Sequence, residues 1–254
     1  MPDLDIDARG YLIDLDGTLI SGQTVLQDAR WLLNAVAGRF VLVSNNAEHT
    51  PAQLSRMLQT IGLAVDAGSI ILAGTSAIDR IAAEQPGASL LLLASPALRS
   101  YARRKGFYLD AARPDVVLVA RDRQFSYAKL AAAVSALADG ARLVVAAPDL
   151  SHPGADGRPV PETGALAAAI IACAGTRDYT VIGKPERALF EMGCRRLCID
   201  FSDAVMIGDN PQTDGLGARR LGMRFWQVHN GSIRHTPQLA VVQSNSGKSA
   251  QRFV

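Results

Sequence analysis

The sequence predicts an α/β protein with a mainly parallel sheet, and three observations carry this prediction. Short apolar runs rich in β-branched residues alternate with longer stretches of helical periodicity along most of the chain. The short runs are continuously apolar, as in strands that are buried on both faces of a sheet. Apolar residues form 48% and charged residues 20% of the 254 residues, which favours a packed core over intrinsic disorder.

The elements follow in order along the chain. The helix expected at 51–61 has the clearest ends, with Thr50 as N-cap, Pro51 at the first helical position and Gly62 just beyond the end. Repetition of a strand followed by a helix is typical of parallel sheet. Strands are expected at 11–15, 40–43, 70–72, 90–93, 116–119, 143–146, 180–182, 204–207 and 225–228, and helices at 26–36, 51–61, 76–84, 97–105, 127–138, 164–174, 186–197 and 213–221.

Two segments lack this periodicity. Residues 148–163 form a long segment rich in Pro, Gly, Asp and Ser, and loops of this length are usually functional or unstructured. Residues 231–254 are polar, so we expect a poorly ordered tail there.

Charge and cysteine content exclude several classes of protein. The net charge of +2 argues against a dedicated binder of nucleic-acid polymers. The longest apolar stretch, residues 90–94, is far below the ~18 to 20 residues that span a membrane, and residues 1–10 do not resemble a signal peptide. Three cysteines suit a reducing compartment, and Cys194 and Cys198 lack further ligands for a metal site. We therefore expect a cytoplasmic protein without membrane association.

The most specific motif follows the first expected strand, where residues 14–18 spell Asp-Leu-Asp-Gly-Thr. Asp14 and Asp16 stand where the apolar run stops, and ligands of open α/β sheets bind at the carboxyl ends of strands. Two neighbouring carboxylates are tolerated if a cation lies between them or one is protonated. Gly17 permits a sharp turn and Thr18 adds a hydroxyl. Asp-x-Asp-Gly alone could equally be a solvated turn, but the full string is more specific.

Three further polar groups stand at the ends of later strands. Ser44-Asn45-Asn46 follows the strand at 40–43, Lys184 precedes Pro185 at the start of a helix, and Asp209 ends the strand at 204–207. Taken singly, the first two are a polar turn and a surface lysine. Together they form an ordered series at strand ends.

This series resembles the four motifs of the haloacid dehalogenase superfamily of phosphatases. Motifs two and three are separated by 140 residues, from Ser44 to Lys184, whereas only 25 separate Lys184 from Asp209. In this superfamily an α/β insertion at that place is the class II cap, and strings such as Gly-Lys-Pro-Glu look like the class IIA subgroup of NagD-like or 4-nitrophenylphosphatase-like enzymes. The resemblance implies a Rossmann-like core from residues 1–73 and 178–254, with an inserted α/β cap at 74–177.

The resemblance also implies residue roles. Asp14 would be the nucleophile that forms an aspartyl-phosphate, and Asp16 would act as general acid and then general base. Lys184 would neutralise charge on Asp14 and on the phosphate. The substrate phosphoryl group would be bound by Ser44, Asn45 and Asn46.

The implied cofactor is Mg²⁺, which prefers oxygen ligands and retains several waters. Its ligands would be a carboxylate oxygen of Asp14, the backbone carbonyl of Asp16 and the carboxylate of Asp209. Asp214 and Asn210 would lie just behind these ligands.

Two departures from the subgroup concern the substrate. Residues 147–149 read Ala-Pro-Asp where the subgroup usually has Asn-Pro-Asp, and residues 161–164 read Pro-Glu-Thr-Gly where it usually has Pro-Gly-Thr-Gly. Both touch the loop 148–163, which offers Asp149, His152 and Arg158 to the leaving group.

The resulting prediction is a Mg²⁺-dependent phosphatase of a small phosphate monoester, such as a nucleotide, sugar or other metabolite phosphate. Alternatives are a phosphotransferase or phosphomutase on the same scaffold and a non-catalytic phosphometabolite-binding protein. Relatives include monomers and homodimers, so the sequence leaves the oligomeric state open.

Overall fold

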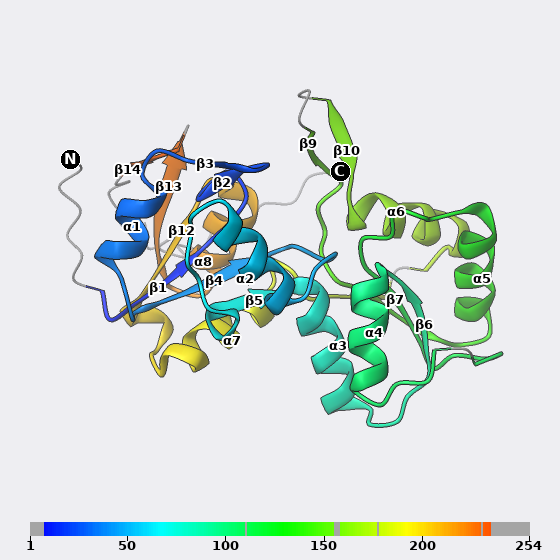
Figure 1. The fold of residues 1–254 in the computed structure, drawn as a ribbon. Helices are drawn as coiled ribbons and strands as arrows, with labels where there is room; N and C mark the ends of the chain where they lie inside the picture. The colour runs from blue at the N-terminus through cyan, green and yellow to red at the C-terminus, as the bar shows by residue number, and fades with distance from the viewer. Residues whose placement is uncertain (1–7, 110, 155–157, 177, 230, 235–254) are drawn as a thin grey trace, which may run out of the picture.

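A computed structural model of the protein describes residues 8–109, 111–154, 158–176, 178–229 and 231–234. It confirms the predicted α/β class with parallel sheet. The described residues form a six-stranded sheet, a four-stranded sheet and two short hairpins. Figure 1 shows the two larger sheets side by side, with one hairpin projecting at the top of the view.

The six-stranded sheet has the order β14-β13-β12-β1-β4-β5, and its neighbours are parallel except at β14. Helices α1 and α2 pack on one face of this sheet, and α7 and α8 pack on the other. The strands are β1 (Gly10–Ile13), β4 (Phe40–Ser44), β5 (Ile70–Leu72), β12 (Ala204–Gly208), β13 (Arg224–His229) and β14 (Ser232–Arg234), and the helices are α1 (Ala29–Ala35), α2 (Pro51–Thr60), α7 (Arg187–Leu197) and α8 (Leu216–Arg220).

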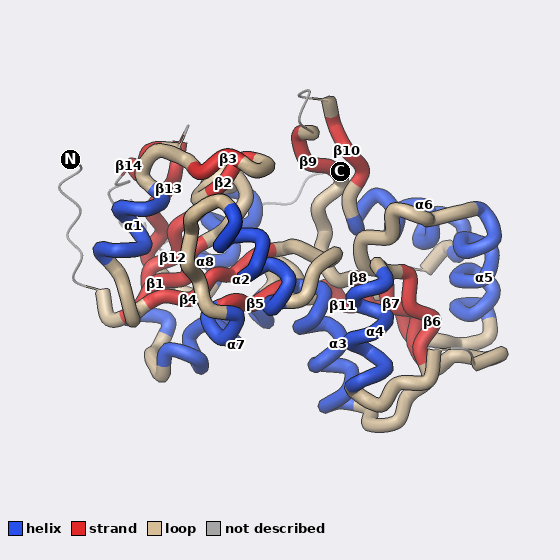
Figure 2. Tube along the Cα trace, in the orientation of Figure 1, coloured by secondary structure: helices blue, strands red, loops and turns tan. Residues whose placement is uncertain are grey.

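The four-stranded sheet has the order β11-β8-β7-β6 (Figure 2). It is parallel throughout. Its two faces are covered by α3 with α4 and by α5 with α6. The strands are β6 (Leu90–Leu93), β7 (Val116–Val119), β8 (Arg142–Val145) and β11 (Thr180–Val181), and the helices are α3 (Ala73–Glu84), α4 (Pro96–Arg104), α5 (Tyr127–Ala138) and α6 (Thr163–Ala174).

The helix ends have the expected local causes. The Thr50 side chain caps α2 by accepting from the backbone N–H of Gln53, while the Gln53 side chain accepts from the backbone N–H of Thr50. The Ser95 and Ser126 side chains cap α4 and α5 by accepting from the backbone N–H groups of Leu98 and Lys129. Each expected strand and helix is formed within the described residues, with ends shifted by at most about three residues, as is usual for fraying ends.

Several elements differ from the sequence expectation. Strand β11 pairs with β8 in the four-stranded sheet. The domain boundary expected from the sequence, at 177/178, places these residues in the core instead. The expected loop 148–163 contains the hairpin of β9 (Ser151–Pro153) and β10 (Pro159–Pro161). A second hairpin, β2 (Ile20–Ser21) with β3 (Thr24–Val25), follows the first motif. Strand β14 begins where the poorly ordered tail was expected, and the rest of that tail, 235–254, lies outside the described residues.

One apolar cluster joins both sheets. It contains side chains from β1 and β4 together with side chains from α3, β6 and α4. Burial of apolar surface therefore continues from the six-stranded sheet to the inserted one. None of the helices in the described part of the chain is long and apolar enough to cross a membrane.

Candidate active site

The middle of the six-stranded sheet brings the predicted motifs together. Strand β1 lies between β4 and β12, with Ile13 beside Leu42 on one side and Ile207 on the other. Because these strands are parallel, Asp14, Ser44 and Asp209 emerge at the same sheet edge. Asp14 is buried, and its backbone N–H donates to the carbonyl of Ile207 at 2.8 Å.

Lys184 connects the first, third and fourth motifs. Its Nζ donates to Asp14 Oδ1 at 2.5 Å and to the carbonyl of Val43 at 2.8 Å, and it lies 2.7 Å from Asp214 Oδ1. The side chain is only 2% exposed. Burial alone would lower the pKa of Lys184, but the two carboxylates raise it above its usual range, so the lysine carries its charge inside the site.

A cluster of carboxylates beside Lys184 fits a divalent cation. Oxygens of Asp14, Asp209 and Asp214 all lie within 4.8 Å of one another. Burial and then the charge of Asp14 raise the pKa of Asp209 to about 6, and burial also raises the pKa of Asp214 against the pull of Lys184. Crowded carboxylates of this kind are stabilised by a cation, and an all-oxygen set suits Mg²⁺.

Two glycines leave the space that these carboxylates occupy. A Cβ at Gly17 would overlap a carboxylate oxygen of Asp209, and a Cβ at Gly208 would overlap one of Asp214. Gly17 also has φ +79°, a conformation that side-chain-bearing residues rarely adopt. A larger residue at either position would therefore displace a carboxylate of the acidic cluster.

Asp16 lies at the opening of the site instead of inside it. Its residue is exposed, whereas Asp14 is buried. Enclosure by nearby protein atoms, followed by the charge of Asp14, nevertheless raises the pKa of Asp16 to about 7. A carboxyl group that is protonated near neutral pH and accessible to solvent is suited to general acid–base work.

The second motif divides into groups with different roles. The Ser44 hydroxyl is buried and accepts from the backbone N–H of Asn46 at 3.1 Å. The Asn46 side-chain oxygen accepts from the backbone N–H groups of Glu48 and His49, so this side chain shapes the loop. Asn46 is one of the three residues predicted to bind phosphate, and its amide oxygen is already used in these local hydrogen bonds.

Asn45 is turned toward the third motif and the inserted segment. Its amide nitrogen donates to Asp149 Oδ2 at 2.8 Å and to the carbonyl of Lys184 at 3.0 Å. Its amide oxygen accepts from the backbone N–H of Lys184 at 2.7 Å. These contacts use both amide groups, so the side chain positions Lys184. Asp149 is expected from its loop to be available to the leaving group, and no feature of the sequence indicates this contact with Asn45.

Three hydrogen bonds from the insertion hold the loop that follows Ser44. The carbonyl of Asn46 accepts from Gly74, that of Ala47 accepts from Arg121 at 3.0 Å, and that of Glu48 accepts from the Ser95 hydroxyl at 2.5 Å. The inserted unit thereby fixes the loop that carries the second motif.

The remaining predicted residues lie around this centre. Asn210 caps the turn Pro211–Gly215 by accepting from the backbone N–H of Gln212 at 2.9 Å, and its carbonyl accepts from Asp214 at 2.9 Å. His152 Nδ1 lies 2.7 Å from Glu162 Oε1 in the inserted segment. The carbonyl of Arg158 accepts from Gly154 and so joins the two sides of the β9–β10 hairpin.

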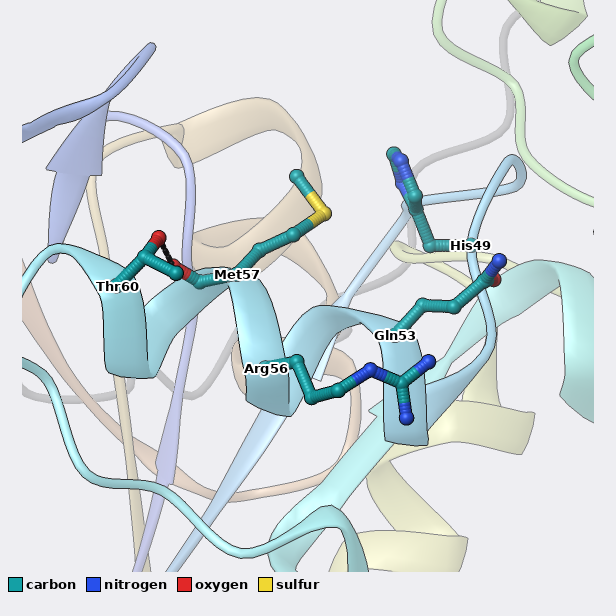
Figure 3. A pocket seen from close by; sticks show the side chains of 5 residues that line it. All are labelled: His49, Gln53, Arg56, Met57 and Thr60. Atoms are coloured by element: carbon teal, nitrogen blue, oxygen red, sulfur yellow. Dashed lines mark hydrogen bonds between the residues drawn. The ribbon is translucent and has the colours of Figure 1, made fainter.

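An open hollow of about 350 Å³ lies along α2 beside this centre. Figure 3 shows its lining side chains, with His49 just before the helix begins. His49 Nδ1 lies 3.2 Å from Asn46 Nδ2, so the hollow adjoins the loop of the second motif. The lining residues are His49, Gln53, Arg56, Met57 and Thr60.

Comparison with known proteins agrees with this geometry. Residues 11–108 match the family of haloacid dehalogenase-like hydrolases, and residues 181–245 match a related family described as HAD-hydrolase-like. The chain is 30% identical over 227 residues to an acid sugar phosphatase of Staphylococcus saprophyticus, covering 88% of this chain and 87% of the relative. It is 29% identical over 226 residues to the 5'-nucleotidase YutF of Bacillus subtilis, covering 88% of each.

Solved structures show the same arrangement. A p-nitrophenyl phosphatase from Archaeoglobus fulgidus has a TM-score of 0.82 at 25% identity, covering 89% of this chain and 88% of the other. The glycerol phosphate phosphatase Rv1692 from Mycobacterium tuberculosis, solved in complex with magnesium, has a TM-score of 0.81 at 29% identity, covering 89% of this chain and 69% of the other.

The chain therefore belongs to the haloacid dehalogenase-like hydrolases. Within them it falls in the NagD-like class IIA branch, and its enzyme class is that of a phosphoric monoester hydrolase. Both statements confirm what the sequence motifs implied.

Proposed function

We propose that this protein is a Mg²⁺-dependent phosphatase that hydrolyses small phosphate monoesters through an aspartyl-phosphate at Asp14. The observation that supports this most strongly is the contact of Lys184 Nζ with Asp14 Oδ1 at 2.5 Å inside the carboxylate cluster. A buried ammonium group fixes one oxygen of Asp14 and adds positive charge where a phosphate would arrive.

The proposed reaction has two balanced steps. A carboxylate oxygen of Asp14 attacks phosphorus, the bond to the leaving oxygen breaks, and Asp16 gives that oxygen its proton. Water then attacks the aspartyl-phosphate while Asp16 takes up a proton, which releases phosphate and restores both carboxyl groups. We propose that the buried Ser44 hydroxyl donates to a phosphoryl oxygen.

Mg²⁺ would supply positive charge against the phosphate oxygens and the acidic cluster. The groups proposed to hold it are the carboxylates of Asp14 and Asp209 and the backbone carbonyl of Asp16. Asp214 lies within the same cluster, but its Oδ1 is 2.7 Å from Lys184. We therefore propose that Asp214 mainly positions Lys184.

The inserted residues, about 74–177, would act as a cap over this site. Asp149 contacts Asn45, and Arg121 contacts the loop after Ser44, so the insertion reaches the catalytic strand ends directly. Caps of this kind exclude water and contact the leaving group. Relatives named as an acid sugar phosphatase, a 5'-nucleotidase and a glycerol phosphate phosphatase support a small organic phosphate as substrate.

Release of inorganic phosphate from p-nitrophenyl phosphate tests this proposal. The wild type should release phosphate with Mg²⁺ and lose this activity in EDTA, and Asp14→Asn should be inactive. The absence of turnover in folded wild-type protein would overturn the enzyme assignment. Turnover that survives in Asp14→Asn would overturn the nucleophile. Transfer of the phosphoryl group to an added alcohol in preference to water would favour a phosphotransferase.

A further inference from the structure

The Glu162 carboxylate, between β10 and α6, is held by two partners. Its Oε1 lies 3.2 Å from Arg121 Nη1 and 2.7 Å from His152 Nδ1. The side chain is 18% exposed, so it is largely enclosed by the insertion. A carboxylate with two fixed partners is a defined feature of the site rather than a mobile surface group.

Backbone contacts connect Glu162 to the catalytic centre. The backbone N–H of Glu162 donates to the carbonyl of Leu150 at 3.0 Å, and that of Gly164 donates to the carbonyl of Asp149 at 2.8 Å. A Cβ at Gly164 would overlap the carbonyl of Pro148, so glycine is what lets these segments approach. The Asp149 side chain in turn meets Asn45, which is bonded to Lys184.

A second route reaches the same centre through Arg121. Its guanidinium lies 3.1 Å from Glu48 Oε2, on the loop that follows Ser44, as well as 3.2 Å from Glu162. One cation is therefore shared between two carboxylates. Arg123 also pairs with Glu48, at 3.3 Å, but its side chain is 72% exposed and its charge is screened by solvent.

Three carboxylates, those of Glu48, Glu162 and Asp149, and one largely buried guanidinium, that of Arg121, therefore lie on this side of the site. Enclosure and the charge of Asp14 are the main causes that raise the pKa of Asp16, and the charge of Glu162 adds to them. Glu162 is therefore within electrostatic range of the opening. The Asp149 carboxylate accepts from the Asn45 amide at 2.8 Å, and the charge of Lys184, which is itself paired with Asp14 and Asp214, acts on it. Carboxylates accept hydrogen bonds from hydroxyl groups and repel anions.

We propose that Glu162 determines the class of leaving group, favouring neutral hydroxylated alcohols such as polyols, sugars and nucleosides. Esters that carry a carboxylate or second phosphate near the ester oxygen would be rejected. This proposal rests on the proposed function, because it concerns the leaving-group side of the same site. Glu162 is a specificity-determining residue in this account and takes no part in the bond-breaking step.

Two monoesters of similar size test the proposal. Glycerol 3-phosphate has a neutral hydroxylated leaving group, whereas 2-phosphoglycolate carries a carboxylate. The wild type should favour glycerol 3-phosphate by at least about tenfold in kcat/KM, since like charges facing each other oppose binding. Glu162→Gln should raise the ratio of phosphoglycolate to glycerol phosphate by about tenfold, and Glu162→Gly should shift it in the same direction.

Matched variants separate charge from general loosening of the insertion. Glu48→Gln removes the other carboxylate that pairs with Arg121, and it should shift the substrate ratio less than Glu162→Gln does, because Arg123 also compensates the charge of Glu48. Glu162→Asp keeps the charge and should also keep the wild-type preference. Thermal melts of each variant show whether it is folded.

The outcomes also distinguish this proposal from the proposed function. If neither ester nor p-nitrophenyl phosphate is hydrolysed, the proposed function fails. If hydrolysis depends on Asp14 but the wild type prefers 2-phosphoglycolate, only the role of Glu162 fails. The same holds if Glu162→Gln and Glu48→Gln shift the substrate ratio equally. The wild-type preference can be measured even if a Glu162 variant does not fold.

Discussion

Asn45→Ala is expected to lower the free energy of unfolding by about 3.5 to 5 kcal/mol. The side chain makes two hydrogen bonds with the backbone of Lys184 and one with the Asp149 carboxylate. Neutral hydrogen bonds contribute about 1 kcal/mol each and those to charged groups about 1.5 to 3 kcal/mol, and the partners left behind are partly or fully buried. Because each kcal/mol moves Tm by roughly 2 to 4 °C in proteins of this size, Tm should fall by roughly 7 to 20 °C.

Thermal unfolding followed by circular dichroism measures this effect, and a phosphatase assay measures its consequence. We expect kcat to fall while KM changes less, because Lys184 would lose the contact that fixes its backbone. Asn34→Ala, on the exposed side of α1, is the matched control and should change stability by less than about 0.5 kcal/mol. A Tm within 2 °C of the wild type for Asn45→Ala, with kcat also unchanged, would refute the positioning role.

Three further predictions follow from the site and the core. With a pKa near 7, Asp16 should be the protonated acid at lower pH, so kcat/KM for an alkyl phosphate should fall about tenfold per pH unit above pH 7. The fall should be shallower for p-nitrophenyl phosphate, whose leaving group needs little protonation, and identical profiles would argue against Asp16 as general acid. Gly17→Ala should raise the Mg²⁺ concentration for half-maximal activity at least about tenfold, because its Cβ would displace Asp209; an unchanged titration would contradict the proposed ligands. Burial raises the pKa of the Cys194 thiol to about 11, so a thiol reagent should modify the two exposed cysteines in the native protein and reach Cys194 only on unfolding. Mass spectrometry of labelled peptides measures this order. Modification of Cys194 before unfolding would contradict a closed core.

Much of the fold could be predicted because its strands are continuously apolar and its helices have recognisable ends. The strands at 90–93 and 116–119 form with the bounds expected from the sequence. Thr50 as N-cap and Pro51 at the first helical position marked the start of α2. The shortest elements could not be predicted, since β2, β3, β9 and β10 contain two or three residues each and are too short for periodicity.

The convergence of the catalytic motifs could be predicted because parallel strands share one carboxyl edge. Side-chain partners that come from distant parts of the chain could not. Asn45 looked like a phosphate ligand beside Ser44, but its partners Asp149 and Lys184 lie 104 and 139 residues away. Glu162 was visible as a departure from the subgroup, yet its pairing with Arg121 depends on how the insertion folds.

The most direct test of the central claim is detection of the aspartyl-phosphate. Asp16→Asn should still be phosphorylated by p-nitrophenyl phosphate, whose leaving group needs little acid, but should hydrolyse the intermediate slowly because it lacks the base. Acid quenching in the presence of Mg²⁺ followed by peptide mass spectrometry should find one added phosphoryl group on Asp14, and none in a variant that also carries Asp14→Asn. A burst of p-nitrophenol with an unmodified Asp14, or with the phosphoryl group on another residue, would contradict the account.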